Sequence, residues 1–388
     1  MILKMSFNII SLLILSCGQN IQQPSQNQTA SESYDAPGDR FNVADTINGL
    51  ITPTGKMHSA RAVHTATVLK NGKVLIVGGF ATSTLASAEI YDPSSRSFTS
   101  VGSMSVARAG HTATLLPNGQ VLIAGGYNGS YLSSTEIFDP LTQTFSTGPE
   151  MNTARSGHTA TLLNNGKILF AGGVGTDWSF LQSAELYDIQ HKTFTGTGAM
   201  TTARESHTAT LLDNGKVLIT GGHKDRKANI TIYASAELYD PVSETFKQTG
   251  NMSIIRHKHD AVKLTDGRVL INGGSDKRDS KGSYASAEFY DPASSTFSSA
   301  GNMKVARYKH NGTSVLLPNV NVLIAGGADQ AEIYQPLSGT FEVVARSMGT
   351  KRLFSCATLL PNGQVLITGG YNENIEASAN AWIYRYQR

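Results

Sequence analysis

Histidine and arginine recur at fixed places along this chain, and residues of these types can bind metals or carry protons. The histidines are His64, His111, His158, His207, His259 and His310, with Ser355 at the seventh place. Each follows by three residues one of the arginines Arg61, Arg108, Arg155, Arg204, Arg256, Arg307 and Arg352. A metal needs three or four ligands within about 2.0–2.2 Å, and equivalent places in repeated units are spread apart by symmetry. We therefore predict a structural role, with each imidazole bonded to backbone near the start of a strand.

A glutamate and a diglycine also recur in step with the arginine. The glutamates are Glu89, Glu136, Glu185, Glu237, Glu288 and Glu332. We expect them to pair with the arginines, because an unpaired buried charge is costly. The diglycines are Gly78-Gly79, Gly125-Gly126, Gly172-Gly173, Gly221-Gly222, Gly273-Gly274, Gly326-Gly327 and Gly369-Gly370. No helix signal follows them and the G-x-x-x-x-G-K-[ST] pattern is absent, so a phosphate-binding loop is not indicated.

These residues belong to a repeated segment, such as RAGHTATLLPNGQVLIAGG from Arg108, which occurs seven times. Successive arginines are 47, 47, 49, 52, 51 and 45 residues apart, a period that suits four strands per unit. HTATLL alternates as a strand, Asn-Gly or Asp-Gly predicts a type I′ turn, and VLIAGG reads as a buried second strand. SAEIYDP predicts a third strand. A fourth follows around a phenylalanine (Phe98, Phe145, Phe194, Phe246, Phe297 or Phe341) and ends in G-x-M or a close variant.

One such unit cannot bury both faces of its sheet, so neighbouring units must stack, and a closed ring leaves few exposed edges. The pattern resembles the kelch family over about residues 41 to 388, with phenylalanine where tryptophan is common on strand four. The resemblance implies an all-β, seven-bladed propeller with four antiparallel strands per blade. The seventh unit stops after its third strand, AWIYRYQR. We therefore predict that the segment from Phe41 to Met57 supplies its fourth strand and closes the ring.

The N-terminus predicts export and anchoring. Residues 1–16 combine Lys4 with a short apolar stretch, as in a signal peptide. The following Cys17 resembles the acylated cysteine of a bacterial lipobox, although Leu15 stands where a smaller residue is usual. An ordinary signal peptide with a chance cysteine is the alternative. Residues 17–40 read as the lipidated cysteine and a flexible tether, since they are polar and nearly devoid of apolar side chains. We expect a lipoprotein of the cell envelope, anchored in the outer membrane and facing the periplasm or the exterior.

Charge excludes nucleic acid as the main partner, because a net charge of +3 on 61 charged residues gives no strong overall field. No oligomerisation signal stands out, and we expect a monomer. No cofactor or metal is predicted.

What varies between the seven copies points to function. Strand alternation places the loops between strands two and three on one face with the connections between blades, and variable loops often bind partners. The candidate binding residues are Phe80, Tyr127, Tyr131, Trp178, Phe180, His223, Lys224, Arg226, Lys227, Lys277, Arg278, Lys281 and Tyr371. We expect this face to be aromatic on one side and basic on the other, which suits a protein or an anionic glycan. Solvated loops without a partner are the plain alternative.

The sequence thus predicts a non-enzymatic binding module. The alternative is a carbohydrate-active enzyme, or one resembling the copper radical oxidases that also carry kelch propellers, at the mouth of the central channel. Those oxidases need a tyrosine crosslinked to a cysteine, with tyrosine and histidine ligands partly from an added C-terminal domain. Here Cys356 replaces a recurrent threonine on an inner strand, and we interpret it as a small core residue.

Overall fold

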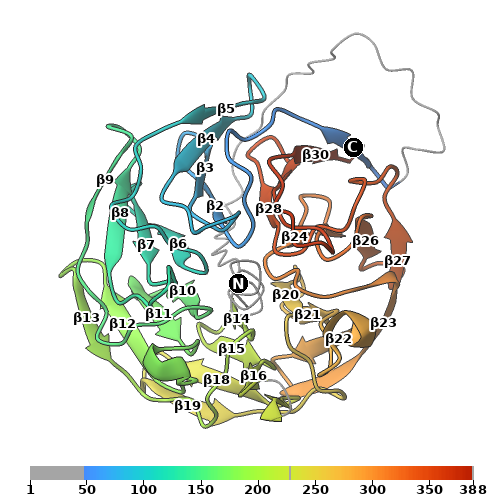
Figure 1. Ribbon diagram of the computed structural model, residues 1–388. Coiled ribbons are helices and arrows are strands. Elements are labelled where there is room, and N and C mark those ends of the chain that lie inside the picture. Colours follow the sequence, from blue (N-terminus) through green and yellow to red (C-terminus); the bar gives the residue numbers. More distant parts are fainter. Residues whose placement is uncertain (1–47, 227–228, 387–388) are drawn as a thin grey trace.

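The protein is an all-β propeller of seven blades, as predicted. The computed structural model describes residues 48–226 and 229–386. Seven four-stranded antiparallel sheets stand around a central axis, with the first strand of each blade innermost (Figure 1). The described residues include two short 3-10 turns, Thr176–Trp178 and Asp279–Gly282. None of the described helices is long and apolar enough to cross a membrane.

The first four blades follow the chain in order, from the inner strand to the outer. Blade 1 contains β2 (Thr65–Val68), β3 (Val74–Val77), β4 (Ala88–Asp92) and β5 (Ser97–Ser100). Blade 2 contains β6 (Thr112–Leu115), β7 (Val121–Ala124), β8 (Thr135–Asp139) and β9 (Thr144–Thr147). Blade 3 contains β10 (Thr159–Leu162), β11 (Lys167–Ala171), β12 (Ala184–Asp188) and β13 (Thr193–Gly196). Blade 4 contains β14 (Thr208–Leu211), β15 (Val217–Thr220), β18 (Ala236–Asp240) and β19 (Thr245–Gln248), and its loop forms the small hairpin β16 (His223–Lys224) and β17 (Thr231–Ile232).

The last three blades complete the ring. Blade 5 contains β20 (Asp260–Lys263), β21 (Val269–Asn272), β22 (Tyr284–Asp291) and β23 (Thr296–Arg307). Blade 6 contains β24 (Ser314–Leu316), β25 (Val322–Ile324), β26 (Glu332–Gln335) and β27 (Thr340–Val343). Blade 7 contains β28 (Cys356–Leu359), β29 (Val365–Thr368) and β30 (Ala381–Arg385), and its outermost strand is β1 (Leu50–Pro53) from the other end of the chain.

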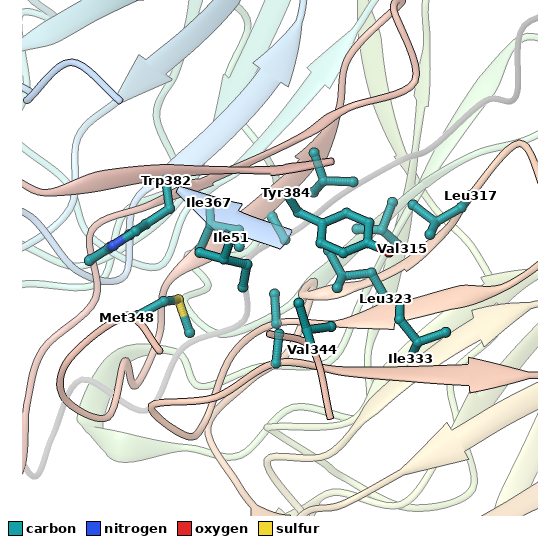
Figure 2. Packing of buried hydrophobic residues seen from close by; sticks show 14 residues of the cluster. Ile51, Val315, Leu317, Leu323, Ile333, Val344, Met348, Ile367, Trp382 and Tyr384 are labelled. Atoms are coloured by element: carbon teal, nitrogen blue, oxygen red, sulfur yellow. The ribbon is translucent and has the colours of Figure 1, made fainter. Parts of the chain in front are cut away.

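Apolar side chains fill each joint between neighbouring blades. The joint between blades 6 and 7 shows the arrangement: Ile333 and Leu323 of blade 6 meet Ile367 and Tyr384 of blade 7 (Figure 2). Equivalent clusters occupy the other six joints. Because neighbouring blades cover both faces of each sheet near its centre, the second strands are buried, six of them along their whole length and β11 except for Lys167.

The diglycines join the blades. In every blade the N–H of the second glycine donates to the carbonyl of the next blade's repeated arginine, as Gly79 does to Arg108 at 2.9 Å and Gly370 to Arg61 at 2.9 Å across the ring closure. The other five bonds, at Gly126, Gly173, Gly222, Gly274 and Gly327, are 2.9 to 3.0 Å long. A Cβ on Gly78 would lie 2.6 Å from the carbonyl oxygen of Arg108, so no side chain fits there. The close approach of the blades therefore requires glycine.

The predicted Arg–Glu pairs form within blades. Arg61 and Glu89 lie 2.9 Å apart, and the five other pairs are 2.7 to 3.0 Å apart, all with fully buried guanidinium groups. The same guanidinium donates to the first glycine's carbonyl, as from Arg61 to Gly78 at 2.7 Å. Blade 7 departs from this rule: Trp382 stands at the glutamate position, and Arg352 lies over its ring at 5.0 Å. A cation–π contact there replaces the ion pair.

The repeated histidines are structural, and they make a contact between blades that the sequence did not predict. Backbone hydrogen bonds with the preceding arginines act on His111, His158 and His207, as expected. Each Nε2 also lies within hydrogen-bonding distance of a side chain of the preceding blade. The partners are Thr368, Thr65, Thr112, Thr159, Thr220 and Asn272, at 2.9 to 3.2 Å. Burial lowers the pKa of His111 to about 3, so the ring is neutral. The histidines therefore link blades, which a reading of one repeat at a time could not show.

The N-terminal strand closes the ring as predicted, with a different residue in the aromatic place. β1 pairs with β30 and lies beside it in Figure 1, blue against red. Ile51 stands opposite Tyr384, as Phe98 stands opposite Tyr91 in blade 1. Ile51, and not Phe41, therefore takes the place of the fourth-strand aromatic. Phe41, like the predicted signal peptide, Cys17 and the tether, lies outside the described residues.

The inner hairpin turns correct the type I′ prediction. In blade 1 Leu69 accepts a bond from Gly72, and Gly72 has a φ of 80° while Asn71 has no positive φ. This is a type I turn followed by a glycine in the left-handed region, because a type I′ turn needs two positive values. In blade 6 the glycine place is held by Val320, at a φ of 65°. A β-branched residue is strained in that conformation.

Replacing Val320 by glycine should stabilise the protein by about 1 kcal/mol, because glycine adopts this φ without steric cost. Guanidinium unfolding measures the change. Gly166→Val is the matched control: it creates the same strain where an added Cβ meets no atom within 4 Å, and it should destabilise by a similar amount. Unchanged stability in both variants would show that the turns carry no strain.

Candidate functional site

The loop face is built as the strand order predicted. The loops between strands two and three lie on the same face as the connections between blades. One backbone pairing holds each loop against the neighbouring connection. In six of the seven blades the residue after the diglycine pairs with the residue after the repeated arginine, as Phe80 pairs with Ala62, His223 with Glu205 and Tyr371 with Leu353. Loop residues are thereby held against the segment between the repeated arginine and histidine.

A ring of backbone hydrogen bonds surrounds the axis on this face. The residue before each repeated histidine adopts a positive φ of 52° to 65°. These seven residues, which we call the axial ring, are Val63, Gly110, Gly157, Ser206, Lys258, Lys309 and Phe354. Six N–H groups among them donate to the carbonyl of a neighbouring member, for example Lys309 to Lys258 at 2.9 Å and Phe354 to Lys309 at 2.7 Å. The ring brings residues far apart in sequence to one mouth.

One side of this mouth is apolar. A cluster of buried residues from four blades and their loops lies there: Ala62, Val63, Phe80, Ala109, Tyr308, Leu353, Phe354 and Tyr371. We call it the axial apolar cluster. Tyr127 packs against its edge and contacts Tyr131, with ring centroids 5.0 Å apart, and Tyr131 meets Trp178 edge-on at 5.5 Å. Trp178 is 39% exposed, so this aromatic track reaches solvent.

The other side is charged. We call Glu205, His223, His257, Lys258, Asp279 and Lys309 the axial charged cluster. His223 and His257 face each other through their Nδ1 atoms at 3.1 Å, and a carboxylate oxygen of Glu205 lies 3.5 Å from Nε2 of His223. The ammonium of Lys258 pairs with the carboxylate of Asp279. All but Asp279 and Lys309 are buried.

Burial shifts the pKa values of this cluster in opposite directions. It raises the pKa of Glu205 to about 7, against which the charges of Arg226 and Lys258 act. It lowers the pKa of Lys258 to about 8, assisted by the neighbouring Lys309. It also lowers the pKa of His223 and His257 well below the usual value, so both imidazoles are neutral. Titratable groups perturbed by burial and specific neighbours are typical of functional sites.

The basic loop residues divide into two sets. Lys224, Lys277 and Lys281 are exposed, and Arg278, also exposed, pairs with Asp276 at 2.5 Å. Arg226 instead lies over Trp178 and Phe180, with its guanidinium carbon 4.8 and 5.6 Å from the ring centroids. The expected division of the face into an aromatic and a basic side is therefore incomplete. Lys227 lies outside the described residues.

A hollow of about 350 Å³ opens beside Arg226 and the aromatic rings that it contacts. It is lined by Trp178, Phe180, Asp225, Arg226 and Asn229. Other candidates lie deeper. Phe80 and Tyr371 are buried in the axial apolar cluster, and Tyr127, Tyr131 and Phe180 are half-buried. Of the basic candidates in the described residues, Arg226 is the one that these contacts join to the aromatic candidates Trp178 and Phe180.

Sequence reasoning missed Glu205, His257, Lys258, Tyr308 and Lys309. They occupy the two positions between the repeated arginine and histidine, a segment we interpreted as scaffold. The sequence did contain a signal for these residues, because the two positions vary although the arginine before them recurs in every copy. They read Ala-Val, Ala-Gly, Ser-Gly, Glu-Ser, His-Lys, Tyr-Lys and Leu-Phe in the seven copies.

Across residues 48–226 and 229–386, no group of three His, Cys, Asp or Glu side chains is placed to hold a metal ion. Cys356 is fully buried on β28, within the apolar joint between blades 7 and 1, and is not part of the mouth. This placement confirms it as a core residue.

Comparison with known proteins agrees with the fold. The Kelch motif matches residues 61–105 and 107–152, which cover blades 1 and 2. These matches and the seven-bladed ring define the class: the chain is a kelch-repeat β-propeller. No curated protein matches it. Among solved structures, a novel fungal alcohol oxidase from the AA5 family, in complex with copper, is similar with a TM-score of 0.67 at 15% identity, over 88% of this chain and 76% of that one. At this identity the similarity concerns the fold alone.

Glu205→Gln tests the charged cluster through pH. Since the folded-state pKa of Glu205 is raised from 4.5 to about 7, the folded protein holds a proton that the unfolded chain releases. This contribution is fully present below pH 4.5 and is lost as pH rises through about 7. We expect the free energy of unfolding of the native protein, relative to the Glu205→Gln variant, to fall over that range. Urea unfolding of both proteins at pH 4.5 to 8 gives the difference, and a flat difference would contradict the assignment.

Proposed function

We propose that this protein is a secreted, lipid-anchored propeller that acts as a non-enzymatic binding module, with its loop face binding a protein or an anionic glycan. The observation that carries the proposal is the concentration of variable aromatic and charged residues around one mouth. Trp178, Tyr131 and Arg226 form its rim, and Lys258 and Lys309 lie at its centre. Such a mixture of rigid aromatic anchors and cations is typical of recognition surfaces.

The repeated residues support the same conclusion by elimination. The arginines, glutamates, diglycines and histidines are engaged in contacts within and between blades, so they are accounted for as scaffold. The positions that differ between blades lie in the loops and beside the axial ring. Function in repeat proteins commonly resides at such positions.

A carbohydrate-active enzyme is the second candidate, and one observation favours it. Glu205 and Lys258 have pKa values of about 7 and about 8 at a mouth near the axis, and general acid–base catalysis uses groups tuned to this range. Turnover of an acidic oligosaccharide that is lost in Glu205→Gln would favour the enzyme. Binding without turnover would favour the module.

Acylation at Cys17 should anchor the protein in the envelope. With Cys17→Ser, we expect the chain to leave the membrane fraction, because a single-residue change removes the site of the acyl chains. Metabolic labelling with a radioactive fatty acid and fractionation of cells measure both effects. Protease treatment of intact cells then separates exterior from periplasmic exposure. Unlabelled native protein would contradict the lipid anchor.

Reversing the exposed charges of the loop face should weaken partner binding. Lys224→Glu with Lys277→Glu is expected to reduce affinity for an immobilised polyuronate, or for an acidic protein recovered from envelope extract, by about tenfold at low salt. The matched control is Lys70→Glu with Lys73→Glu, on the inner hairpin turn at the opposite face. Biolayer interferometry at two salt concentrations gives the affinities. Equal losses in both double variants would indicate nonspecific attraction, and no binding by the native protein would refute the module.

A further inference from the structure

Lys309 is placed at the mouth with an incompletely satisfied ammonium group. It is half-buried in the axial ring, and its Nζ donates to the hydroxyl of Tyr371 at 2.9 Å. The same Nζ lies 5.3, 5.7 and 5.5 Å from the ring centroids of Tyr308, Phe354 and Tyr371. An ammonium has three N–H donors. Within the described residues, Nζ of Lys309 donates one hydrogen bond, to the hydroxyl of Tyr371. Two donors therefore remain for a ligand.

The charges around Lys309 leave an excess of one positive charge. Lys258, its neighbour in the axial ring, pairs with Asp279, and Asp279 is the nearest carboxylate to act on Lys309. Glu205 lies 3.5 Å from Arg226, which offsets its charge when it is ionised. His223 and His257 are neutral. Two ammonium groups, of the buried Lys258 and the half-buried Lys309, thus share the carboxylate of the half-exposed Asp279.

We propose that Lys309, with Lys258 and Tyr371, binds the carboxylate of an acidic sugar, a uronate, at the axial mouth. The inference rests on the proposed function, because it specifies which chemical group of the ligand would bind at the centre of the loop face. A carboxylate carries the single negative charge that the excess requires, and it can accept both remaining N–H groups of Lys309 and the hydroxyl of Tyr371. A phosphate dianion would bring a second charge toward Asp279.

The surroundings of the lysines favour a sugar over an acidic peptide. Tyr308, Phe354 and Tyr371 form a buried aromatic wall beside the ammonium, and Tyr127, Tyr131 and Trp178 extend the aromatic track outward to solvent. A uronate ring has an apolar C–H face and hydroxyl groups at its edge, which match aromatic faces with polar tips such as those of Tyr and Trp. Burial lowers the pKa of Lys309, and a bound carboxylate would offset this cost of desolvation.

Titration calorimetry on the full-length protein in detergent tests the site with small probes. We expect native protein to bind glucuronate and digalacturonate, and glucose or inorganic phosphate more weakly by at least about tenfold. Lys309→Met, which keeps the length of the side chain, should weaken uronate binding by about tenfold or more, and Tyr371→Phe by a few fold. Lys247→Met, an exposed lysine on the outer strand β19, is the matched control and should bind as native. Thermal unfolding of each variant checks that the fold is kept.

The outcomes separate this site from the proposed function. If a polyuronate binds native protein and Lys309→Met equally, the axial site is refuted while the binding module stands. If an Asp/Glu hexapeptide binds in a Lys309-dependent way and uronates do not, the sugar assignment is overturned. If neither polymers, peptides nor uronates bind, both proposals fail. Loss of glucuronate binding in Lys309→Met, with Lys247→Met unaffected, supports the site.

Discussion

The hydrogen bond from each diglycine to the arginine carbonyl of the next blade sets the spacing on which the rest of the ring depends. Seven such bonds, 2.9 to 3.0 Å long, run around the molecule. They require backbone to approach backbone so closely that a Cβ on Gly78 or Gly369 would overlap the arginine carbonyl. The same arginine's guanidinium bonds its own blade's glycine carbonyl and glutamate. One residue type thus ties each blade to its neighbour, and in six blades its buried charge is tolerated because the guanidinium pairs with a buried glutamate.

This scaffold frees the positions beside it. The arginine and histidine on either side make the side-chain contacts within and between blades, and the two residues between them contribute backbone bonds, so their side chains can differ from blade to blade. Blades 1, 2 and 7 place Ala62, Ala109 and Leu353 there, which bury with the axial apolar cluster. Blades 4 to 6 place Glu205, Lys258 and Lys309 there. The scaffold repeats seven times around the axis, but the residues at the mouth are apolar on one side and charged on the other.

The asymmetry has an electrostatic consequence. Burial opposes ionisation of both acids and bases, and it moves the pKa of Glu205 up and that of Lys258 down toward neutrality. Arg226 and Asp279 offset part of this effect from the loops. The cost is accepted only where neighbouring blades hold these groups together, and a scaffold that needed only stability would place apolar residues at such positions.

Sequence alone determined the number of blades, the four-strand unit, the closing strand and the Arg–Glu pairing, because each follows from a local pattern repeated at a fixed period. It also identified the loop face, since strand alternation fixes which turns share an end. It gave the wrong inner turn, because Asn-Gly suits two turn types that differ only in backbone angles. It did not reveal that Ile51 replaces the fourth-strand aromatic, that histidines bond to the preceding blade, or that Lys258, Lys309 and Tyr371 meet. Those contacts join residues of different blades, so they exist only once the ring is closed and its seven units face one axis.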